Sequence, residues 1–308
     1  MNVILFLGAH RTGMATFDDY MRRHAVRLAS QGVSFWGPRR ARQGILSRRG
    51  SADPAAVARA HARVRALLDR TAARGVKTLV VSDPQMVGSI EGNVTSRSLY
   101  PRAAENLSLV ARPFRDHISS VMFSPRSLDT YWCSALARGV AGGVGIPGRA
   151  ELRDIVDDSR SWRDVITDVA SALPGVPIRV LPFENFMGRP DALLAKGAGF
   201  DAPFDGQRKW LNRSPGLPEL RRAVSNRGGA PAALPFGMGR WNPFTNEEHA
   251  ILREKHADDM MWLASGADGR ATLTEDCLRD RAGPTPPAGA QAKGQRDELE
   301  ERHMARPG

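Results

Sequence analysis

The sequence has few of the features that mark secreted, metal-binding or membrane proteins. Its two cysteines, Cys133 and Cys277, lie far apart and predict neither a disulfide framework nor a metal site. No apolar run approaches the roughly 20 residues that cross a bilayer. The N-terminus has only a short apolar run at residues 2–7, without a basic start or a cleavage site. We therefore expect a strand there rather than a signal peptide, no transmembrane segment and a cytoplasmic location.

Aromatic residues are also scarce, at 6%, whereas basic residues are abundant and unevenly placed. Residues 1–80 hold 15 lysines and arginines against 4 acidic residues, and the other 228 residues hold 29 of each. The excess includes a dense basic stretch with Arg39, Arg40, Arg42, Arg48 and Arg49. This stretch is either a solvated loop or a lid that attracts an anionic cofactor or acceptor. Nucleic acid is a weaker alternative, because aromatics are not interleaved with these arginines.

Short apolar runs alternate with helical patterns along most of the chain. We expect strands at residues 2–7, 32–36, 77–82, 117–124 and 177–181. We expect helices at residues 16–28, 55–74, 99–114, 128–140, 151–157, 162–173, 190–196, 218–225 and 246–264. This alternation predicts an α/β fold, a three-layer sandwich with a central parallel sheet and helices on both faces. The expected domain covers residues 1–266, and a tail at residues 282–308, rich in proline, glycine and charge, is expected to be disordered.

The strongest sign of a binding site is the turn after the first predicted strand. Gly8 and Gly13 bound this turn, and a helical pattern follows it. A strand, a glycine turn and a helix together aim several backbone N–H groups at one point, which suits a phosphate or another small oxyanion. Arg11 adds a fixed positive charge with a planar fork of donors. The alternative is a tight turn that binds nothing.

The same turn lacks the residues that hold magnesium and ATP. The nucleotide-hydrolase P-loop has the pattern Gly-x4-Gly-Lys-Ser/Thr, in which the lysine contacts the outer phosphates and the hydroxyl holds magnesium. Gly8 and Gly13 have this spacing, but Met14 and Ala15 replace the lysine and the hydroxyl residue. The turn therefore predicts phosphate binding without magnesium–ATP chemistry, and no metal-ligand spacing is present elsewhere.

A second informative pair is Arg126, just past a predicted strand, and Ser134, two helical turns further on. Each is placed to bind a phosphate. With the first turn, this pair makes the chain resemble the P-loop sulfotransferases, specifically the bacterial group that uses 3′-phosphoadenosine 5′-phosphosulfate (PAPS). The resemblance covers most of residues 2–265 and implies a P-loop nucleotide-binding fold without a metal.

The resemblance also implies roles for individual residues. The 5′-phosphosulfate would be bound by the turn, made of Gly8, Ala9, His10, Arg11, Thr12, Gly13, Met14, Ala15 and Thr16. The 3′-phosphate would be bound by Arg126 and Ser134, and a C-terminal segment would add Arg240 and Trp241. Family members usually have hydroxyl residues where this chain has Met14 and Ala15, so Thr12 or Thr16 would have to supply one.

The implied reaction moves a sulfuryl group from PAPS to a hydroxyl or amine of an unknown acceptor, a sugar, a lipid or a small molecule. Arg11 would stabilise the developing charge. Asp83, at the end of a predicted strand, is the first candidate for the general base, and His10 is the second. Asp83 is alternatively a simple cap residue. An alternative is an inactive nucleotide-binding relic of the same fold. It is favoured by Met14, by Ala15 and by Pro84, which stands where the family often has glutamate. A P-loop kinase is a weaker alternative.

Overall fold

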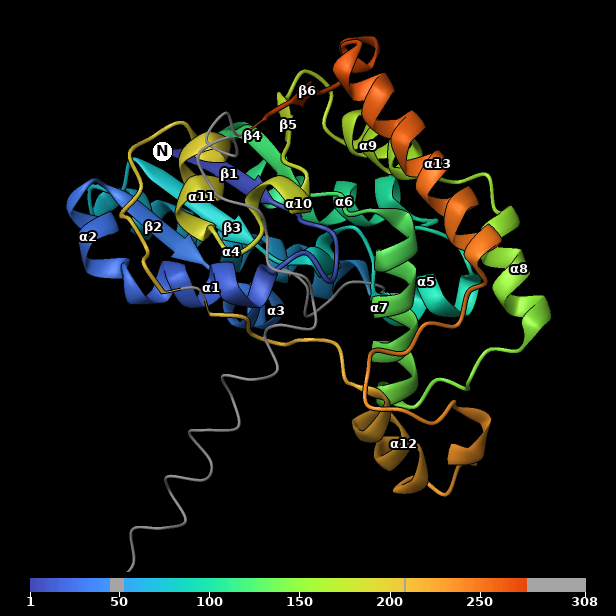
Figure 1. The fold of residues 1–308 in the computed structure, drawn as a ribbon. Helices are drawn as coiled ribbons and strands as arrows, with labels where there is room; N and C mark the ends of the chain where they lie inside the picture. Colours follow the sequence, from blue (N-terminus) through green and yellow to red (C-terminus); the bar gives the residue numbers. More distant parts are fainter. Residues whose placement is uncertain (45–52, 208, 276–308) are drawn as a thin grey trace, which may run out of the picture. The chain divides into compact units, whose positions relative to one another are not determined.

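A computed structural model of the chain describes residues 1–44, 53–207 and 209–275 (Figure 1). The tail expected to be disordered, at residues 282–308, lies outside the described residues, as do Arg48, Arg49 and Cys277. The following account concerns the compact unit Met1–Glu275.

The centre of this unit is a six-stranded sheet in which all paired strands run parallel. Its strands are β1 (Asn2–Phe6), β2 (Val33–Trp36), β3 (Thr78–Ser82), β4 (Ile118–Phe123), β5 (Ile178–Val180) and β6 (Thr272–Leu273), in the order β2-β3-β1-β4-β5-β6. The predicted parallel sheet is confirmed. The short edge strand β6 was not predicted, and it continues the sheet beyond residue 266.

Helices pack on both faces of the sheet. Alternate residues of β1 belong to two separate cores, with Val3 and Leu5 in the larger and Ile4 and Phe6 in the smaller. The smaller core is covered by α1 (Met14–Arg23), α2 (Ala25–Ser30) and α11 (Pro190–Ala198). The larger core is covered mainly by α4 (Pro54–Ala73), α6 (Ala103–Ala111), α7 (Leu128–Gly142) and α9 (Trp162–Ala172). This arrangement confirms the predicted α/β class.

The remaining helices are shorter or lie around this frame. They are α3 (Pro38–Gly44), α5 (Ile90–Ser96), α8 (Arg149–Asp157), α10 (Phe183–Phe186), α12 (Leu217–Ser225) and α13 (Asn246–Ala264), with the 3₁₀ turns η2 (Pro84–Met86), η3 (Arg112–His117), η4 (Pro231–Ala233) and η5 (Ala267–Gly269). The predicted caps are confirmed, since Asp53 accepts from the backbone of α4 and Thr245 forms a capping box with Glu248 on α13.

Three expectations about local structure were wrong. The described part of the basic stretch after Trp36 is not a loop, because Arg39, Arg40 and Arg42 lie on α3. The helix predicted at residues 16–28 starts at Met14 and is interrupted at His24. The helix predicted at residues 99–114 is reduced to α6 with η3, and α5 was missed, because it is short and contains glycine and β-branched residues.

Sheet topology brings three loops to one edge. β1 lies between β3 and β4, and Phe6 pairs with Ser82 on one side and with Met122 on the other. From β1 the chain first adds strands on one side, β2 and β3, and then on the other side, β4, β5 and β6. Loops that follow parallel strands lie at the C-terminal ends of those strands. The turn after β1 therefore lies between the segments that follow β3 and β4.

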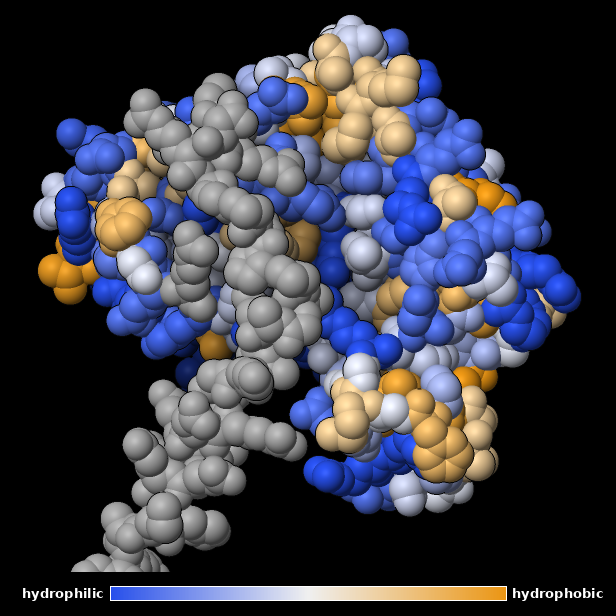
Figure 2. Space-filling view, viewed as in Figure 1, coloured by the Kyte–Doolittle hydropathy of each residue, from blue (hydrophilic) through white to orange (hydrophobic). Residues whose placement is uncertain are grey.

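Residues 216–240 form a segment outside the sheet that contains α12 (Figure 1). Figure 2 shows an apolar patch over this part of the surface, and Phe236 and Met238 within the segment are 82% and 86% exposed. An antiparallel bridge between Gly216 and Arg240 closes the segment.

Candidate phosphate site

The turn after β1 has three residues in the left-handed region of backbone conformation. Gly8, Arg11 and Gly13 all have positive φ, at 52°, 68° and 79°. The Ala9 N–H donates to the Ser124 carbonyl at 3.1 Å, and the Thr12 hydroxyl donates back to the Ala9 carbonyl at 2.6 Å. These contacts fold the turn over the end of β1, and α1 begins directly after Gly13.

Five consecutive backbone N–H groups of the turn, those of residues 11–15, donate to no partner within the described residues. The next two N–H groups, of Thr16 and Phe17, return to the Gly13 carbonyl. A run of unpaired N–H groups at the start of a helix forms a concave site for an anion. The free N–H groups of the turn are thus arranged as donors around one point.

Met14 and the two threonines of the turn have structural contacts. The Met14 side chain is buried and lies over Gly8, where an added Cβ would meet its sulfur at 2.4 Å. The position of the P-loop lysine is thus filled by a core side chain. The Thr12 hydroxyl is used within the turn, and the Thr16 hydroxyl accepts from the Leu211 N–H at 3.2 Å, which leaves the Thr16 proton for another acceptor.

Arg126 and Ser134, predicted as a phosphate pair, both contact this turn through Arg11. The Arg11 Nε donates to the Ser134 hydroxyl at 2.8 Å, and Arg126 donates to the Arg11 carbonyl at 2.8 Å. The Arg126 guanidinium also lies over the Phe183 ring at 5.0 Å. The structure thus brings together the turn and the second motif, which lie more than 100 residues apart in the sequence.

Positive charge gathers at this site, and the charge of Glu184 offsets it in part at Arg126. Burial lowers the pKa of Arg11 to about 10, with smaller contributions from Arg126, Arg138 and Arg240. Burial also lowers the pKa of Arg126. Within the described ranges, none of these four arginines forms an ion pair with a carboxylate. Such a cluster strongly favours an anionic ligand.

Sequence reasoning missed Ser214, which completes this cluster. Its hydroxyl accepts from Arg11 Nη2 at 3.1 Å and lies 2.5 Å from the Ser134 hydroxyl. Ser214 lies in an irregular segment just before α12, 80 residues from Ser134. No local pattern marks it, because only the folded chain brings the two serines together.

A pocket with aromatic walls lies beside the turn. Its lining includes Thr12, Gly13, Ser124, Phe183 and Trp210. The Ser124 hydroxyl is buried and has no hydrogen-bond partner in the part of the chain that the structure describes. The pocket has a volume of about 20 Å³, room for about one water molecule, so as it stands it is too small for a nucleotide base.

The two C-terminal candidates differ in their surroundings. Arg240 is exposed, and its charge acts on Arg11. Trp241 is only 5% exposed and belongs to the larger core. The structure therefore gives Trp241 a packing role, and its implied contact with the cofactor stays a prediction.

Asp83 lies at the end of β3, beside the turn, and its side chain is fully buried. Its carboxylate accepts from the Gln85 N–H at 3.0 Å and so caps η2. It also accepts from Arg42 Nε at 2.9 Å and from Arg42 Nη2 at 3.3 Å. The cap alternative thus describes what the structure shows, and a catalytic role for Asp83 stays a prediction.

His10 has a fixed position within the turn. Its backbone N–H donates to the Tyr100 hydroxyl at 2.8 Å, and its Nδ1 lies 2.7 Å from the same oxygen. The two rings stack with their centroids 5.7 Å apart. Tyr100 was not singled out from the sequence, because it lies 90 residues from His10.

No protein-family model matches this chain, and no curated protein matches it either. Across the described residues, no three or more His, Cys, Asp or Glu side chains are grouped to hold a metal ion. Among the helices of residues 1–44, 53–207 and 209–275, none has the length and apolar character needed to cross a bilayer.

Proposed function

We propose that this protein is a P-loop-type sulfotransferase that binds PAPS and moves its sulfuryl group to a hydroxyl or amine of an acceptor. The observation that carries the proposal is the turn at residues 8–16. There, five unpaired backbone N–H groups and Arg11 lie with Arg126 and Ser134, and neither arginine forms a direct ion pair with a carboxylate among the described residues. A nucleotide with anionic groups at both its 5′ and 3′ positions complements this arrangement.

The residues present fit the two anionic parts of such a nucleotide. The N–H groups of the turn and Arg11 would hold the 5′-phosphosulfate, and Arg126, Ser134 and Ser214 would hold the 3′-phosphate. When bound, PAPS supplies an activated sulfuryl group. Fixed N–H donors and the Arg11 charge stabilise negative charge at the turn without rearrangement.

Asp83 is the proposed general base, which takes the proton that the substrate's hydroxyl or amine must lose. Its Oδ1 accepts from both Gln85 and Arg42, whereas its Oδ2 accepts only from Arg42 and keeps one lone pair. Because Asp83 is fully buried, an acceptor group reaches this oxygen only if the half-exposed Arg42 moves.

One observation favours a second candidate, a PAPS-binding protein without turnover. The carboxylate of Asp83 is buried, ion-paired and used as a cap, so it is stable without any substrate. A P-loop kinase has less support, because Met14 fills the lysine position with a core side chain.

The experiment that tests the function measures release of adenosine 3′,5′-bisphosphate from PAPS across a panel of sugars, lipids and small molecules. The proposal predicts release that depends on one acceptor class and is lost in Arg11→Ala. Bisphosphate binding without release from any acceptor supports the second candidate. Failure to bind the bisphosphate contradicts both.

A further inference from the structure

The segment of residues 216–240 divides its apolar side chains between the core and the solvent. Four of them are at most 8% exposed and belong to the larger core: Leu217, Leu220, Val224 and Leu234. Phe236 and Met238 are instead 82% and 86% exposed, and they lie in the part of the surface where Figure 2 shows an apolar patch. The core of the protein therefore does not use these two side chains.

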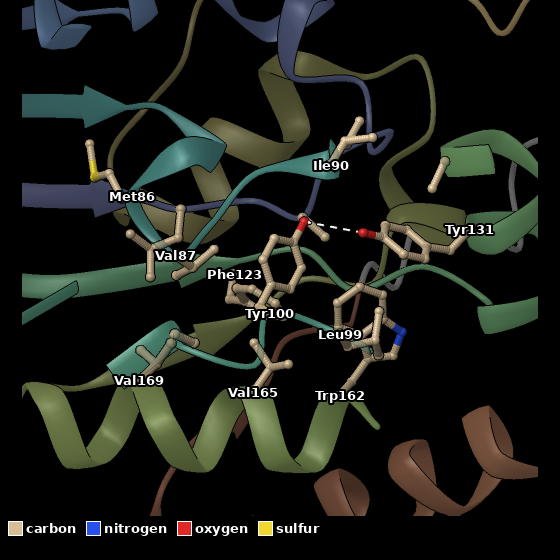
Figure 3. Close-up of a cluster of buried hydrophobic side chains, with 14 of the residues drawn as sticks. Met86, Val87, Ile90, Leu99, Tyr100, Phe123, Tyr131, Trp162, Val165 and Val169 are labelled. Atoms are coloured by element: carbon tan, nitrogen blue, oxygen red, sulfur yellow. Dashed lines mark hydrogen bonds between the residues drawn. The ribbon is translucent and has the colours of Figure 1, made fainter. Parts of the chain in front are cut away.

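The larger core shows how this chain packs the aromatic rings that it buries. Tyr100 and Tyr131 lie against Trp162, with ring centroids 6.3 Å and 5.1 Å from that of the tryptophan (Figure 3). Phe236 has no such apolar surroundings. Single exposed apolar residues are common on protein surfaces, whereas a patch of them marks a surface that binds a partner or a membrane.

Positive charge accompanies the apolar patch. The segment contains four arginines, Arg221, Arg222, Arg227 and Arg240, against one acidic residue, Glu219, which gives it a net charge of +3. The Arg221 guanidinium lies over the Phe236 ring, 4.0 Å from its centroid. Glu219 accepts from the Gly216 N–H at 3.1 Å and so caps α12. Basic and apolar groups are thus adjacent, and the one carboxylate is used within the segment.

The segment is attached to the rest of the unit at several points. Arg227 donates to the carbonyls of Val140 and Ala141 in the last turn of α7, at 2.5 Å and 2.7 Å. The Leu217 N–H donates to the Gly239 carbonyl at 2.8 Å, next to the bridge that closes the segment. These contacts fix the base of the segment, so its patch is already formed before any partner binds.

Both ends of the segment lie near the phosphate site. Ser214, two residues before the segment, contacts Arg11, and Arg240 at its other end lowers the pKa of Arg11 by its charge. The segment therefore links the exposed patch to the arginine cluster.

We propose that residues 216–240 dock the protein on the surface of an anionic lipid bilayer, with Phe236 and Met238 inserted among the lipids and the arginines of the segment against the headgroups. A bilayer of this kind complements both properties of the segment, since it has apolar chains beneath a layer of negative charge. The docking does not rest on the proposed function, because it needs neither a nucleotide nor a reaction.

A second copy of the chain complements this surface less well. Two segments that each carry a net charge of +3 repel one another. A stable protein interface also buries roughly 800 Å² on each partner, whereas only two large apolar side chains of the segment are strongly exposed. Insertion into a bilayer needs few apolar residues, because basic residues supply further attraction to anionic lipids.

Flotation of the full chain with lipid vesicles tests the proposal. The vesicles contain phosphatidylcholine alone, or phosphatidylcholine and phosphatidylserine at roughly 2:1. We expect the protein to float with the anionic vesicles, less so as the salt concentration rises, and to bind the neutral vesicles little. Failure to bind the anionic vesicles at low salt would overturn the proposal.

Matched substitutions separate docking through the patch from the general attraction of a basic protein to anionic vesicles. Phe236→Ser with Met238→Ser should weaken vesicle binding about tenfold or more, because burial of even one large apolar side chain contributes this much. Phe204→Ser with Met261→Ser replaces two side chains that are 80% and 70% exposed outside the segment, and it should change nothing. Equal binding by the two double variants would overturn the proposal.

The charge of the segment is tested by Arg222→Gln, with Arg63→Gln as the matched change of an exposed arginine on α4. One basic residue at an anionic surface contributes about fivefold in affinity. We expect that loss for Arg222→Gln and no loss for Arg63→Gln, whereas equal affinities would mean that overall charge alone attracts the protein. Gel filtration without lipid gives the last check, since self-association that Phe236→Ser with Met238→Ser abolishes would assign the patch to a second copy and overturn the docking.

Discussion

The turn after β1 and the turn after β3 lie at the ends of neighbouring strands, yet their polar groups differ sharply. The first holds unpaired N–H groups, and its arginines form no direct ion pair with a carboxylate among the described residues. In the second, the Asp83 carboxylate is paired with Arg42 and with the backbone of η2. Unpaired polar groups are costly to bury, so a fold that keeps them is suited to a ligand. The comparison therefore supports anion binding more directly than catalysis.

The largest expected effect comes from a substitution in the turn after β3. Asp83→Asn keeps the shape and most hydrogen bonds of the carboxylate but removes a proton acceptor. If Asp83 is the base, turnover falls by about 10²–10⁴, while bisphosphate affinity is unchanged. Steady-state rates and calorimetry measure the two quantities. Asp53→Asn, which alters the cap of α4, is the matched control. Unchanged turnover in Asp83→Asn would leave Asp83 with its structural role alone.

Arg126→Ala tests the site formed by the turn after β1 and its arginines. Charge-assisted hydrogen bonds contribute roughly 1.5–3 kcal/mol, so the bisphosphate should bind about 10–100-fold more weakly. AMP, which lacks the 3′-phosphate, should lose little. Arg102→Ala removes an exposed arginine that pairs with Glu105 and should change neither affinity. Equal losses for both nucleotides would place Arg126 away from the 3′-phosphate.

The lowered pKa of Arg11 predicts a pH dependence of binding. In the free protein Arg11 loses its proton as the pH passes about 10, whereas a bound anion raises this pKa and keeps the arginine charged. Affinity is thus fully present below pH 9 and falls as the pH rises through about 10, by about tenfold at pH 11. Equilibrium dialysis of the wild type and Arg11→Met measures this. A wild type with the same flat profile as Arg11→Met would contradict the assigned role.

The smallest effect concerns the residue that the sequence did not reveal. Ser214→Ala removes one hydroxyl from the pair that contacts Arg11, so the bisphosphate should bind about 3–10-fold more weakly, the effect of one ordinary hydrogen bond. Ser171→Ala, at an exposed position on α9, should have no effect. If calorimetry gives equal affinities for the two variants, the Ser214 hydroxyl contacts Arg11 but not the bound nucleotide.

The parts of this site that could be predicted are those with a local sequence signal. The glycines at the ends of the turn, the strand before it and the charge of Arg126 can all be recognised within a few residues. Ser214, Trp210 and Tyr100 could not be predicted, because each reaches the site from an irregular or distant segment and its role depends on long-range contacts. β6 was missed for a different reason: a strand of two residues, Thr272 and Leu273, is too short to show a periodic pattern.

The proposed role of Asp83 shows a second limit. Its place after a buried strand correctly located it beside the turn, but its pairing partner Arg42 lies on a helix that the sequence analysis took for a loop. Proline at the start of α3 and the absence of apolar periodicity hid that helix. An ion pair between distant residues changes the chemistry of a carboxylate, and only the folded structure reveals it.

The central claim is that the turn after β1 and the Arg126–Ser134–Ser214 cluster bind the two anionic ends of one nucleotide. Calorimetric titration of the purified protein with adenosine 3′,5′-bisphosphate, AMP and magnesium–ATP tests it most directly. The claim predicts that the bisphosphate binds more tightly than either other nucleotide, by about tenfold or more if each charge-assisted bond contributes as expected. Tighter binding of magnesium–ATP, or equal binding of AMP, would contradict it.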